Sequence, residues 1–451
     1  MSKLRILSRT ATNVNSFGRY FSTSVLKQSS AGDDADFNAR KSFHKVSNKA
    51  TADIQVRNQS NQAESATATS VSLNNRNMYI NQNALRNVDL SPLDDMYNDD
   101  TYTRSVEKYI GTVKVPVGMV NVDVNGIYAK GSFSVPMATT EAALVASYSR
   151  GCKLIRACGG VNTAVIGQTI QRVPEFIFRN LPDAYTFLQW FDRPEVFNAL
   201  KLAAESTTNH GKLIKIVPNL HGNKVHVKFL YETGNASGQN ISTFATNAAI
   251  MNVLPECPIQ PEKWLLEAGG SQDKKASIGF YNNSRGLYVT GEMVCPKELV
   301  ESILKTSVDN MNDANESTLM SLYMQGVTGL TYHASNALAA IFIACGQDPA
   351  CVAESHVGVQ EARKTPEGDL RLRITMPSLM VGTVGGGTFL PSQRTCLDIV
   401  QLPEEKSRLA FAEVILGVIL GGELSIAGAM TAHHFSSAHH SLARKGNGVR
   451  K

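Results

Sequence analysis

Two adjacent lysines, Lys274 and Lys275, follow Asp273 in a loop that a pair of glycines precedes. A lysine that is held beside carboxylates and away from bulk water is able to polarise a carbonyl oxygen and to stabilise an oxyanion. Adjacent lysines are more often a solvated surface pair. The residues by themselves leave both interpretations open.

Two carboxylates lie at the ends of predicted helices. Glu141 falls in the first turn of a helix predicted over residues 139–149, where it would complement the helix dipole or, if buried, serve as a general acid. Asp348 follows an apolar helix predicted over residues 328–345, and an acid at that end opposes the dipole. The sequence therefore predicts a compensating cation beside Asp348, such as a lysine.

A glycine cluster and a histidine cluster are further candidates for binding or catalysis. Residues 382–388 hold four glycines, which let backbone N–H groups approach an anionic or bulky ligand, although a bare turn is an equal alternative. The cluster is neither GxGxxG nor a P-loop. Residues 433–440 contain four histidines without carboxylate or cysteine companions at ligand spacing, so no metal site is predicted. A single histidine there has a pKa suited to protonating a leaving thiolate.

The hydrophobic pattern places these residues among mixed helices and strands, which indicates an α+β fold class. Strands are predicted over 108–117, 126–135, 213–217, 224–231, 287–295 and 370–380, and further helices over 195–205, 242–253, 297–307 and 408–432. The pattern changes over 173–263, which we interpret as a small α+β unit inserted into a larger one. The larger domain would then comprise 91–172 and 264–442, followed by a tail over 443–451.

The positive charge is confined to the N-terminus. Residues 1–30 hold five basic residues and no acidic one, and they are rich in Ser and Thr. This composition is typical of a mitochondrial presequence, which we predict over 1–27, with a basic tail on a cytoplasmic protein as the alternative. The polar segment 28–90 is predicted to be a disordered linker. The remaining chain balances 39 basic residues against 39 acidic ones, so nucleic-acid binding is not predicted.

Cysteine usage and the longest apolar stretch exclude further classes. Seven cysteines form no CxxC pair, which disfavours a zinc site and a disulfide framework. Residues 409–430 are strongly apolar but are interrupted by Glu413 and Glu423. Because carboxylates are costly in hydrocarbon, we predict a buried core helix and no membrane span.

Several segments match one known family in order and approximate spacing. They are residues 135–141 with 144–152, Asp273-Lys274-Lys275, 343–348, and 375–388. On these motifs the chain resembles the 3-hydroxy-3-methylglutaryl-coenzyme A (HMG-CoA) reductases over about residues 107–440. The resemblance implies a large domain around a long central helix, with an inserted small ferredoxin-like NADPH-binding domain. It also implies a homodimer, with a tetramer as the alternative.

The resemblance implies an oxidoreductase that converts HMG-CoA to mevalonate and CoA by two hydride transfers from NADPH, with NADH as the alternative, in isoprenoid and sterol biosynthesis. Lys274 would stabilise the oxyanion, and Glu141 would supply a proton. Asp348 would influence both of these residues by its negative charge. His439 would protonate the CoA thiolate. The substrate-binding residues implied are Arg172, Lys275, His333, Asn336, Glu107, Ile110 and Gly111. The cofactor-binding residues implied are Thr208, Asn209, Asn235, Gly238, Asn240, Gly385, Gly386 and Gly387.

Some positions depart from the family pattern. The cofactor motif GDAMGMN reads GNASGQN over 234–240, and Thr208-Asn209 replace a serine–arginine pair, which weakens a preference for a 2′-phosphate. Glu316 stands where a lysine meets the substrate, and Glu267 where a pocket serine falls. Two further hypotheses therefore stay open. One is a reductase for another acyl-CoA thioester without a distal carboxylate, and the other is a catalytically weakened protein that binds CoA esters.

Overall fold

The computed structural model describes residue 102 and residues 105–432. The predicted presequence over 1–27, the linker over 28–90 and the tail over 443–451 lie outside the described residues, and so does His439. Within the described part, helices and strands are mixed along the chain, and most strand pairs are antiparallel. The fold is therefore α+β, as the sequence predicts.

The elements keep the following bounds along the chain. The strands are β1 (Val117–Gly126), β2 (Lys130–Ala138), β3 (Val161–Arg172), β4 (Glu175–Ile177), β5 (Lys212–His221), β6 (Lys224–Glu232), β7 (Lys263–Leu265), β8 (Gly286–Cys295), β9 (Val359–Lys364) and β10 (Leu370–Leu379). The α-helices are α3 (Leu144–Ala157), α4 (Leu181–Phe191), α5 (Pro194–Glu205), α6 (Gln239–Val253), α7 (Lys297–Leu304), α8 (Val308–Met324), α9 (Ala334–Ala344), α10 (Val352–Ser355), α11 (Pro391–Ile399) and α12 (Ser407–Thr431). The short 3₁₀ helices are η4 (Leu254–Glu256), η5 (Ile278–Tyr281), η6 (Pro349–Cys351) and η7 (Gly386–Phe389).

Strand β3 connects two groups of strands in one hydrogen-bonded sheet. The order is β7-β4-β6-β3-β8-β10-β9, with β5 added on β6 and the β1–β2 hairpin added through β1 on β3. The first part of β3 pairs antiparallel with β8 and parallel with β1. Its last three residues, from Ile170 to Arg172, pair with β6 instead. The chain therefore enters the 173–263 region directly from a core strand.

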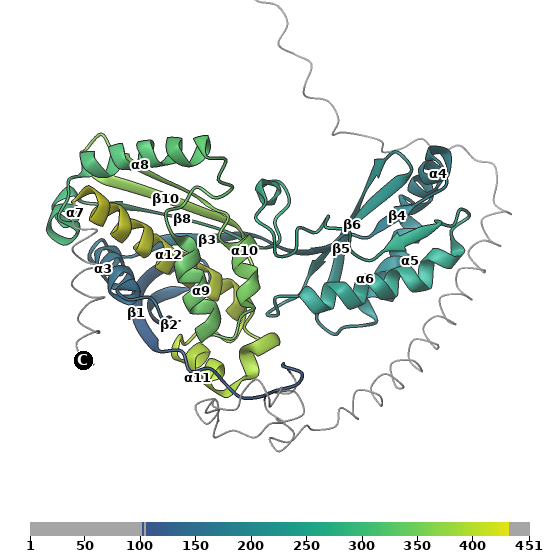
Figure 1. Ribbon diagram of the computed structural model, residues 1–451, viewed down its shortest axis with the longest axis horizontal. Coiled ribbons are helices and arrows are strands. Elements are labelled where there is room, and N and C mark those ends of the chain that lie inside the picture. Colours follow the sequence, from purple (N-terminus) through teal and green to yellow (C-terminus); the bar gives the residue numbers. More distant parts are fainter. Residues whose placement is uncertain (1–101, 103–104, 433–451) are drawn as a thin grey trace, which may run out of the picture. The chain divides into compact units, whose positions relative to one another are not determined.

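The 173–263 region has its own strands, helices and aromatic core. Its strands lie in the order β5-β6-β4-β7, all antiparallel to their neighbours. Figure 1 shows α4, α5 and α6 gathered beside β4, β5 and β6 in teal. Phe176 of β4 lies at the centre of the core, with its ring centroid 4.9 Å from that of Phe187 and 6.3 Å from that of Phe191 on α4. Tilted aromatic contacts of this kind stabilise a small core.

Helix α12 is the central helix of the larger group. It is apolar around its whole circumference, which is the pattern of a helix enclosed by other elements. It packs against β1, β3, β8 and β10 and against α3, α8 and α9. Among the described residues, α12 is the one helix long and apolar enough to cross a membrane, yet 94% of its apolar window is buried inside the protein. Its burial agrees with the core helix that the sequence predicts.

Both carboxylates of α12 have specific backbone partners. Glu413 accepts hydrogen bonds from the N–H groups of Ile127, Tyr128 and Ala129 in the β1–β2 turn, at 3.1, 2.8 and 2.8 Å. Glu423 accepts from the N–H groups of the two residues before α9, at 2.5 and 2.9 Å. Buried carboxylates are tolerated when donors satisfy their oxygens. The two glutamates thus attach a turn and a helix start to the core.

Several element boundaries differ from the sequence prediction. The strand predicted over 108–117 is wrong, because β1 begins only at Val117 and the residues before it are not assigned to a strand. The helix predicted from residue 139 begins at Leu144, after Ala143 in a left-handed conformation. The helix predicted over 328–345 begins at Ala334, because Glu423 binds the preceding N–H groups and His333 has a non-helical backbone conformation. Tertiary partners set these boundaries.

Candidate active site

Lys274 and Asp348 face one another from two different loops. The Lys274 Nζ lies 3.1 Å from the Asp348 Oδ2, and their side chains are 46% and 39% exposed. The hydrogen bond with Asp348 raises the pKa of Lys274, so the amine keeps its proton. A protonated amine with this exposure can still reach a ligand's oxygen atom. The cation that the sequence predicts beside Asp348 is therefore Lys274.

The position of Asp348 corrects one sequence prediction. Helix α9 ends at Ala344, and Gly346 then turns the chain with a φ of 68°, so Asp348 does not oppose the dipole of α9. Asp348 instead caps η6, where its Oδ1 accepts the Ala350 N–H at 3.0 Å. Burial by itself raises the pKa of Asp348, but the hydrogen bonds from Lys274 and Ala350 and the charge of Lys274 bring it below its usual value. Asp348 is thus a carboxylate near neutral pH.

A buried charge network holds the loop that carries Lys274. Asp273 lies 2.8 Å from the Nη2 of Arg285 and 3.6 Å from the Nη1 of Arg172. Arg285 is fully buried at the start of β8, and its Nε lies 3.4 Å from Glu354. Burial raises the pKa of Glu354 to about 7. Buried charges require such partners, and this network fixes the lysine loop to the sheet.

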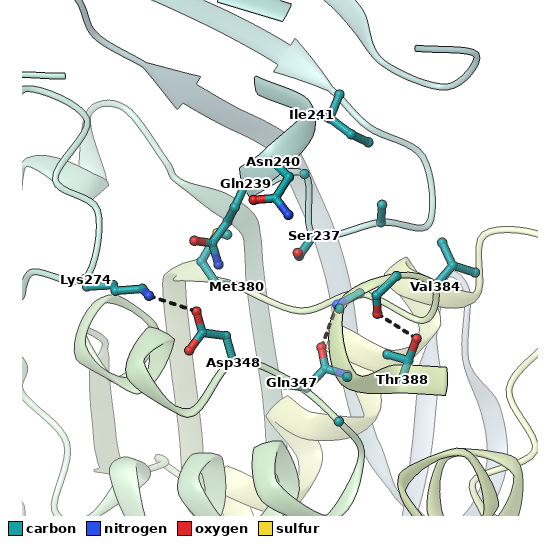
Figure 2. A pocket seen from close by; sticks show the side chains of 17 residues that line it. Ser237, Gln239, Asn240, Ile241, Lys274, Gln347, Asp348, Met380, Val384 and Thr388 are labelled. Carbon is teal, nitrogen blue, oxygen red and sulfur yellow. Dashed lines mark hydrogen bonds and ion pairs between the residues drawn. The ribbon is translucent and has the colours of Figure 1, made fainter. Parts of the chain in front are cut away.

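The Lys274–Asp348 pair lies on the wall of a cavity of about 430 Å³. Figure 2 shows Gln239 and Asn240 across from Asp348 and Gln347, with Lys274 at one side. The lining comes from three glycine-containing segments, residues 236–241, 346–348 and 384–388, together with Lys274, Met380 and Gly382. Three loops that are distant in the sequence thus form one concave site.

Glycine is required where these loops meet. A Cβ on Gly382 would lie 2.5 Å from the Ser237 nitrogen, and one on Gly346 would lie 2.4 Å from the Gly387 oxygen. The Gln347 side-chain oxygen accepts the Gly382 N–H at 2.8 Å and fixes one of these approaches. The glycine cluster over 382–388 is therefore part of a ligand-sized cavity as well as a turn.

The eight residues predicted to bind a cofactor fall into two groups. Five of them line the cavity, namely Gly238, Asn240, Gly385, Gly386 and Gly387. A Cβ on Gly385 or on Gly386 would meet no atom within 4 Å, so their backbone faces open space. Backbone N–H groups in such a position suit an anionic or polar ligand.

The other three residues lie elsewhere. The Asn235 carbonyl accepts the Thr383 N–H at 2.9 Å, so Asn235, between β6 and α6, joins the small group of strands and helices to the glycine cluster. Thr208 accepts the N–H groups of His210 and Gly211, both at 3.1 Å, in the turn before β5. Asn209 is exposed in the same turn. None of the three lines the cavity.

Comparison with known proteins gives the family. A family model for hydroxymethylglutaryl-coenzyme A reductase matches residues 72–444. The chain belongs to this family. The 3-hydroxy-3-methylglutaryl-coenzyme A reductase of Pyrococcus abyssi is 39% identical over 350 residues, covering 76% of this chain and 85% of the relative. That of Methanocaldococcus jannaschii is 36% identical over 347 residues, covering 76% and 85%.

A solved structure is similar in fold. The class II HMG-CoA reductase of Streptococcus pneumoniae bound to NADPH superposes with a TM-score of 0.60 at 17% identity, covering 80% of this chain and 100% of that one. The resemblance that the sequence motifs indicate is confirmed by the family match. The α+β fold agrees with this structural likeness.

In this member of the reductase family, Arg172 is bound by the protein's own groups. Its side chain is 8% exposed, and its Nη1 lies 3.1 Å from Glu267. Its Nη2 donates to the Thr243 hydroxyl at 2.7 Å. The family pattern has a serine at the position of Glu267. Glu267 therefore forms an ion pair with the guanidinium group that was predicted to bind substrate.

A second group of predicted residues surrounds the start of α9. His333 caps this helix, with its Nδ1 3.4 Å from the Asn336 amide nitrogen and its ring 5.0 Å from that of Tyr148. Burial lowers the pKa of His333, which is therefore neutral near pH 7. Glu141 lies exposed in the turn before α3, and its charge adds to the effect of burial that raises the pKa of Tyr148. These residues do not line the cavity that holds Lys274.

The remaining predicted substrate residues are at the surface. Lys275 is exposed and donates to the Asp273 carbonyl at 3.1 Å. Glu107, Ile110 and Gly111 precede β1, with Glu107 exposed and the other two half-buried. Among residues 102 and 105–432, no group of three His, Cys, Asp or Glu side chains could hold a metal.

The structure also gives partners to Glu316 and shows residues that sequence reasoning missed. Glu316 on α8 forms an exposed ion pair with Arg363 on β9. Sequence reasoning missed Arg285, Glu354 and Cys351. One feature of the sequence could have indicated Arg285, because a charged residue directly before an apolar strand requires a partner. Nothing in the local sequence indicates the contacts of Glu354 or Cys351.

Proposed function

We propose that this protein reduces HMG-CoA to mevalonate and CoA with two molecules of NADPH. The observation that carries the proposal is the Lys274–Asp348 pair, 3.1 Å apart on the wall of a glycine-lined cavity. The names of its relatives support the same reaction. Each turnover adds two hydrides and two protons to the thioester, and the carbon–sulfur bond breaks.

Lys274 supplies the electrostatic part of this chemistry. Its ammonium group donates a hydrogen bond to the thioester oxygen as negative charge develops there, which favours the tetrahedral state over the flat ground state. Asp348 keeps Lys274 protonated and oriented. Glu141 is the proposed proton donor to the aldehyde-level oxygen, and His439 is the proposed donor to the leaving thiolate.

The cavity fits the nicotinamide cofactor that the family uses. NADPH supplies the hydride when it is bound. The open backbone at Gly385 and Gly386 and the glycine approach at Gly382 provide a cradle that side chains would fill. Thr208 and Asn209 offer no fork-shaped cation for a 2′-phosphate. NADH is therefore the alternative cofactor, and the assay below compares the two.

The inserted region is proposed to be a ferredoxin-like cofactor domain over residues 173–263, between the two parts of the large domain, 91–172 and 264–442. The element order β4-α4-α5-β5-β6-α6-β7 follows the β-α-β-β-α-β pattern, with one additional helix. Six of the cavity residues, Ala236 to Ile241, come from this region. A cofactor domain that supplies one wall and a large domain that supplies Lys274 and Asp348 would meet at the cofactor.

A homodimer, with a tetramer as the alternative, is proposed because the Glu141 group and the Lys274 cavity are separate within one chain. A partner subunit would bring them together. Sedimentation equilibrium is expected to give at least twice the chain mass. A monomer that is active at nanomolar concentration would contradict this proposal.

A second candidate function rests on Arg172. Because Glu267 lies 3.1 Å from its guanidinium, a carboxylated acyl group would have to compete with an internal ion pair. This observation favours a thioester without a distal carboxylate. A catalytically weakened CoA-ester-binding protein is the third outcome that the assay distinguishes.

The assay uses purified protein lacking residues 1–27, with NADPH or NADH and a panel of acyl-CoA thioesters. Oxidation of NADPH with HMG-CoA, and mevalonate as the product, is the expected result. Turnover only with an uncarboxylated thioester would favour the second candidate. If the folded protein binds CoA esters but turns over none of them, the third candidate, a catalytically weakened CoA-ester-binding protein, is favoured.

The N-terminal segment 1–27 is proposed to direct the protein to mitochondria in preference to the cytoplasm. The five basic residues without an acid among residues 1–30 support this proposal. A fluorescent protein fused to residues 1–30 is expected to accumulate in mitochondria. A cytosolic signal, unchanged from the unfused fluorescent protein, would contradict it.

A further inference from the structure

Arg408 is a buried cation at the start of α12 that the chemistry above does not use. It is 2% exposed. Its Nε donates to the Val381 carbonyl at 2.8 Å, and its Nη1 donates to the Thr233 hydroxyl at 3.3 Å. A longer contact of 3.5 Å joins the same Nη1 to the Gly234 carbonyl. One guanidinium group thus binds two segments that are distant in the sequence, one after β6 and the other after β10.

These two segments lead directly into two walls of the cavity. The first continues into residues 236–241, and the second continues into the glycine cluster over 382–388. Figure 2 shows Ser237 of the first wall and Val384 of the second. Arg408 itself does not line the cavity. It therefore binds the chain just before each wall begins.

The two walls are also joined through their backbones, and Arg408 supports this junction. The Asn235 carbonyl accepts the Thr383 N–H at 2.9 Å. The Thr233 hydroxyl, which accepts from Arg408, donates to the Ala236 carbonyl at 2.9 Å. Arg408 therefore begins a chain of hydrogen bonds that sets the path of the first wall and its distance from the second.

The guanidinium group of Arg408 makes these contacts as an uncompensated charge. Its acceptors in the described part of the chain are neutral oxygens, and its Nη2 is buried there without a hydrogen-bond partner. Burial lowers the pKa of Arg408 to about 10, so it stays protonated near neutral pH. An unpaired buried charge is costly. Costly features of this kind are expected where a functional site depends on them.

We propose that Arg408 is a positioning residue that fixes the distance between the cavity walls 236–241 and 382–388, and so determines how tightly the nicotinamide cofactor is bound. The proposal rests on the reductase function above and concerns the same site. A guanidinium group suits this role because its rigid fork directs two donors at fixed angles, whereas an ammonium group is a single point. Within residues 105–432, the hydrogen-bond partners of Arg408 do not include Lys274 or Asp348, so the reacting amine should stay in place without it.

The main test compares Arg408→Met with Arg408→Lys in the full-length protein. Methionine removes the donors, and lysine keeps the charge but not the fork. In both variants we expect the Kd for NADPH, measured by calorimetry, to rise about tenfold, with kcat at saturating NADPH and the KM for the thioester within about threefold. A wild-type Kd in Arg408→Met would overturn the proposal. Full recovery in Arg408→Lys would also overturn it, because the charge would then act without the fork.

The acceptor side is tested at Thr233. Thr233→Val keeps the shape of the side chain but removes the hydroxyl that joins Arg408 to the Ala236 carbonyl, so the Kd for NADPH should rise. Thr233→Ser keeps the hydroxyl and should bind NADPH almost as wild type does. Equal weakening in both variants would assign the effect to the lost methyl packing and contradict the proposal. This pair keeps the proposal testable even if Arg408→Met does not fold.

Stability separates positioning from a purely structural role. Replacing a buried charge by an apolar side chain of similar volume is often neutral for folding. The free energy of unfolding of Arg408→Met, measured by urea denaturation, should therefore stay close to that of wild type while the Kd for NADPH rises. A loss of stability with an unchanged Kd would show a purely structural role and would reject the proposal.

The matched control is Arg371→Met on β10. Arg371 is exposed and does not line the cavity. Its substitution should leave the Kd for NADPH and kcat unchanged. A rise in Kd equal to that of Arg408→Met would show a general sensitivity to the loss of one positive charge and would contradict the assigned role.

A measurement without ligand separates this inference from the proposed function. Hydrogen exchange followed by mass spectrometry reports local opening of the backbone. In Arg408→Met, peptides that cover residues 234–241 and 381–388 should exchange faster than in wild type, whereas peptides from β8 should not change. This result supports the positioning role even if wild type does not reduce HMG-CoA. Unchanged exchange in both segments of an enzyme that reduces HMG-CoA would reject the positioning role alone.

Discussion

At the scale of single residues, the candidate site depends on how each charge is compensated. Lys274 has Asp348 as its partner, and Asp273 has Arg285 and Arg172. Isolated charges are costly away from water, whereas paired ones remain ionised. Asp348 is therefore available as a fixed negative charge, and Lys274 as a fixed positive charge, before any substrate arrives. Such preorganisation is the main source of electrostatic catalysis.

Lys274→Met should abolish most of the activity. Methionine keeps most of the length of the side chain but removes the only donor that we assign to the thioester oxygen. We expect kcat to fall by at least about a thousandfold, while binding of CoA, measured by calorimetry, is retained. Lys297→Met on the exposed surface of α7 serves as the control and should keep full activity. Near-normal turnover in Lys274→Met would exclude the assigned role.

At the scale of elements, the contact between α3 and α12 sets the core. Gly151 on α3 faces Gly421 on α12, and a Cβ on Gly151 would lie 1.7 Å from the Gly421 oxygen. Beside it, Tyr148 occupies the space where a Cβ on Gly422 would lie, 2.1 Å from the ring. The two helices are therefore in backbone contact, and this contact also places the turn that carries Glu141.

Gly151→Ala should destabilise the protein although alanine favours helices. The added methyl group has to separate α3 from α12 because the opposing atom belongs to the backbone. We expect a loss of about 1–3 kcal/mol in the free energy of unfolding, measured by urea denaturation. Ala146→Ser, on the exposed face of the same helix, should change it by less than about 0.5 kcal/mol. Equal effects of the two substitutions would show that the helices can separate freely.

At the scale of the whole molecule, the buried carboxyl groups make stability depend on pH. Glu423 is 1% exposed, and burial raises its pKa to about 7. A carboxyl group with a raised pKa in the folded state favours folding fully below its unfolded pKa. This contribution is lost as the pH rises through the folded pKa, because ionisation is then easier in the unfolded chain. The window therefore runs from about 4.5 to about 7.

Glu423→Gln should flatten this part of the pH dependence. Glutamine keeps an oxygen for the N–H groups of Tyr332 and His333 but does not ionise. Between pH 4.5 and pH 8, the free energy of unfolding of wild type should fall by about 3 kcal/mol relative to that of the variant. Urea denaturation at several pH values measures the difference. A constant difference across this range would contradict the raised pKa.

Much of the local structure could be predicted because it depends on neighbours in the sequence. The apolar run in α12 indicated a buried helix, and the strands near β6, β8 and β10 were predicted within a few residues of their observed bounds. The start of α9 was missed because Glu423, which is remote in the sequence, binds the N–H groups before it. Local patterns cannot show such partners.

The sequence by itself determined the family, the α+β class and the identity of the chemically able side chains, because these depend on residue types and their spacing along the chain. Tertiary structure decided which of those side chains meet. It placed Lys274 3.1 Å from Asp348 and gave Arg172 an internal partner in Glu267. Charge pairing and hydrogen bonding act over a few ångströms, so only the folded path of the chain selects the partners.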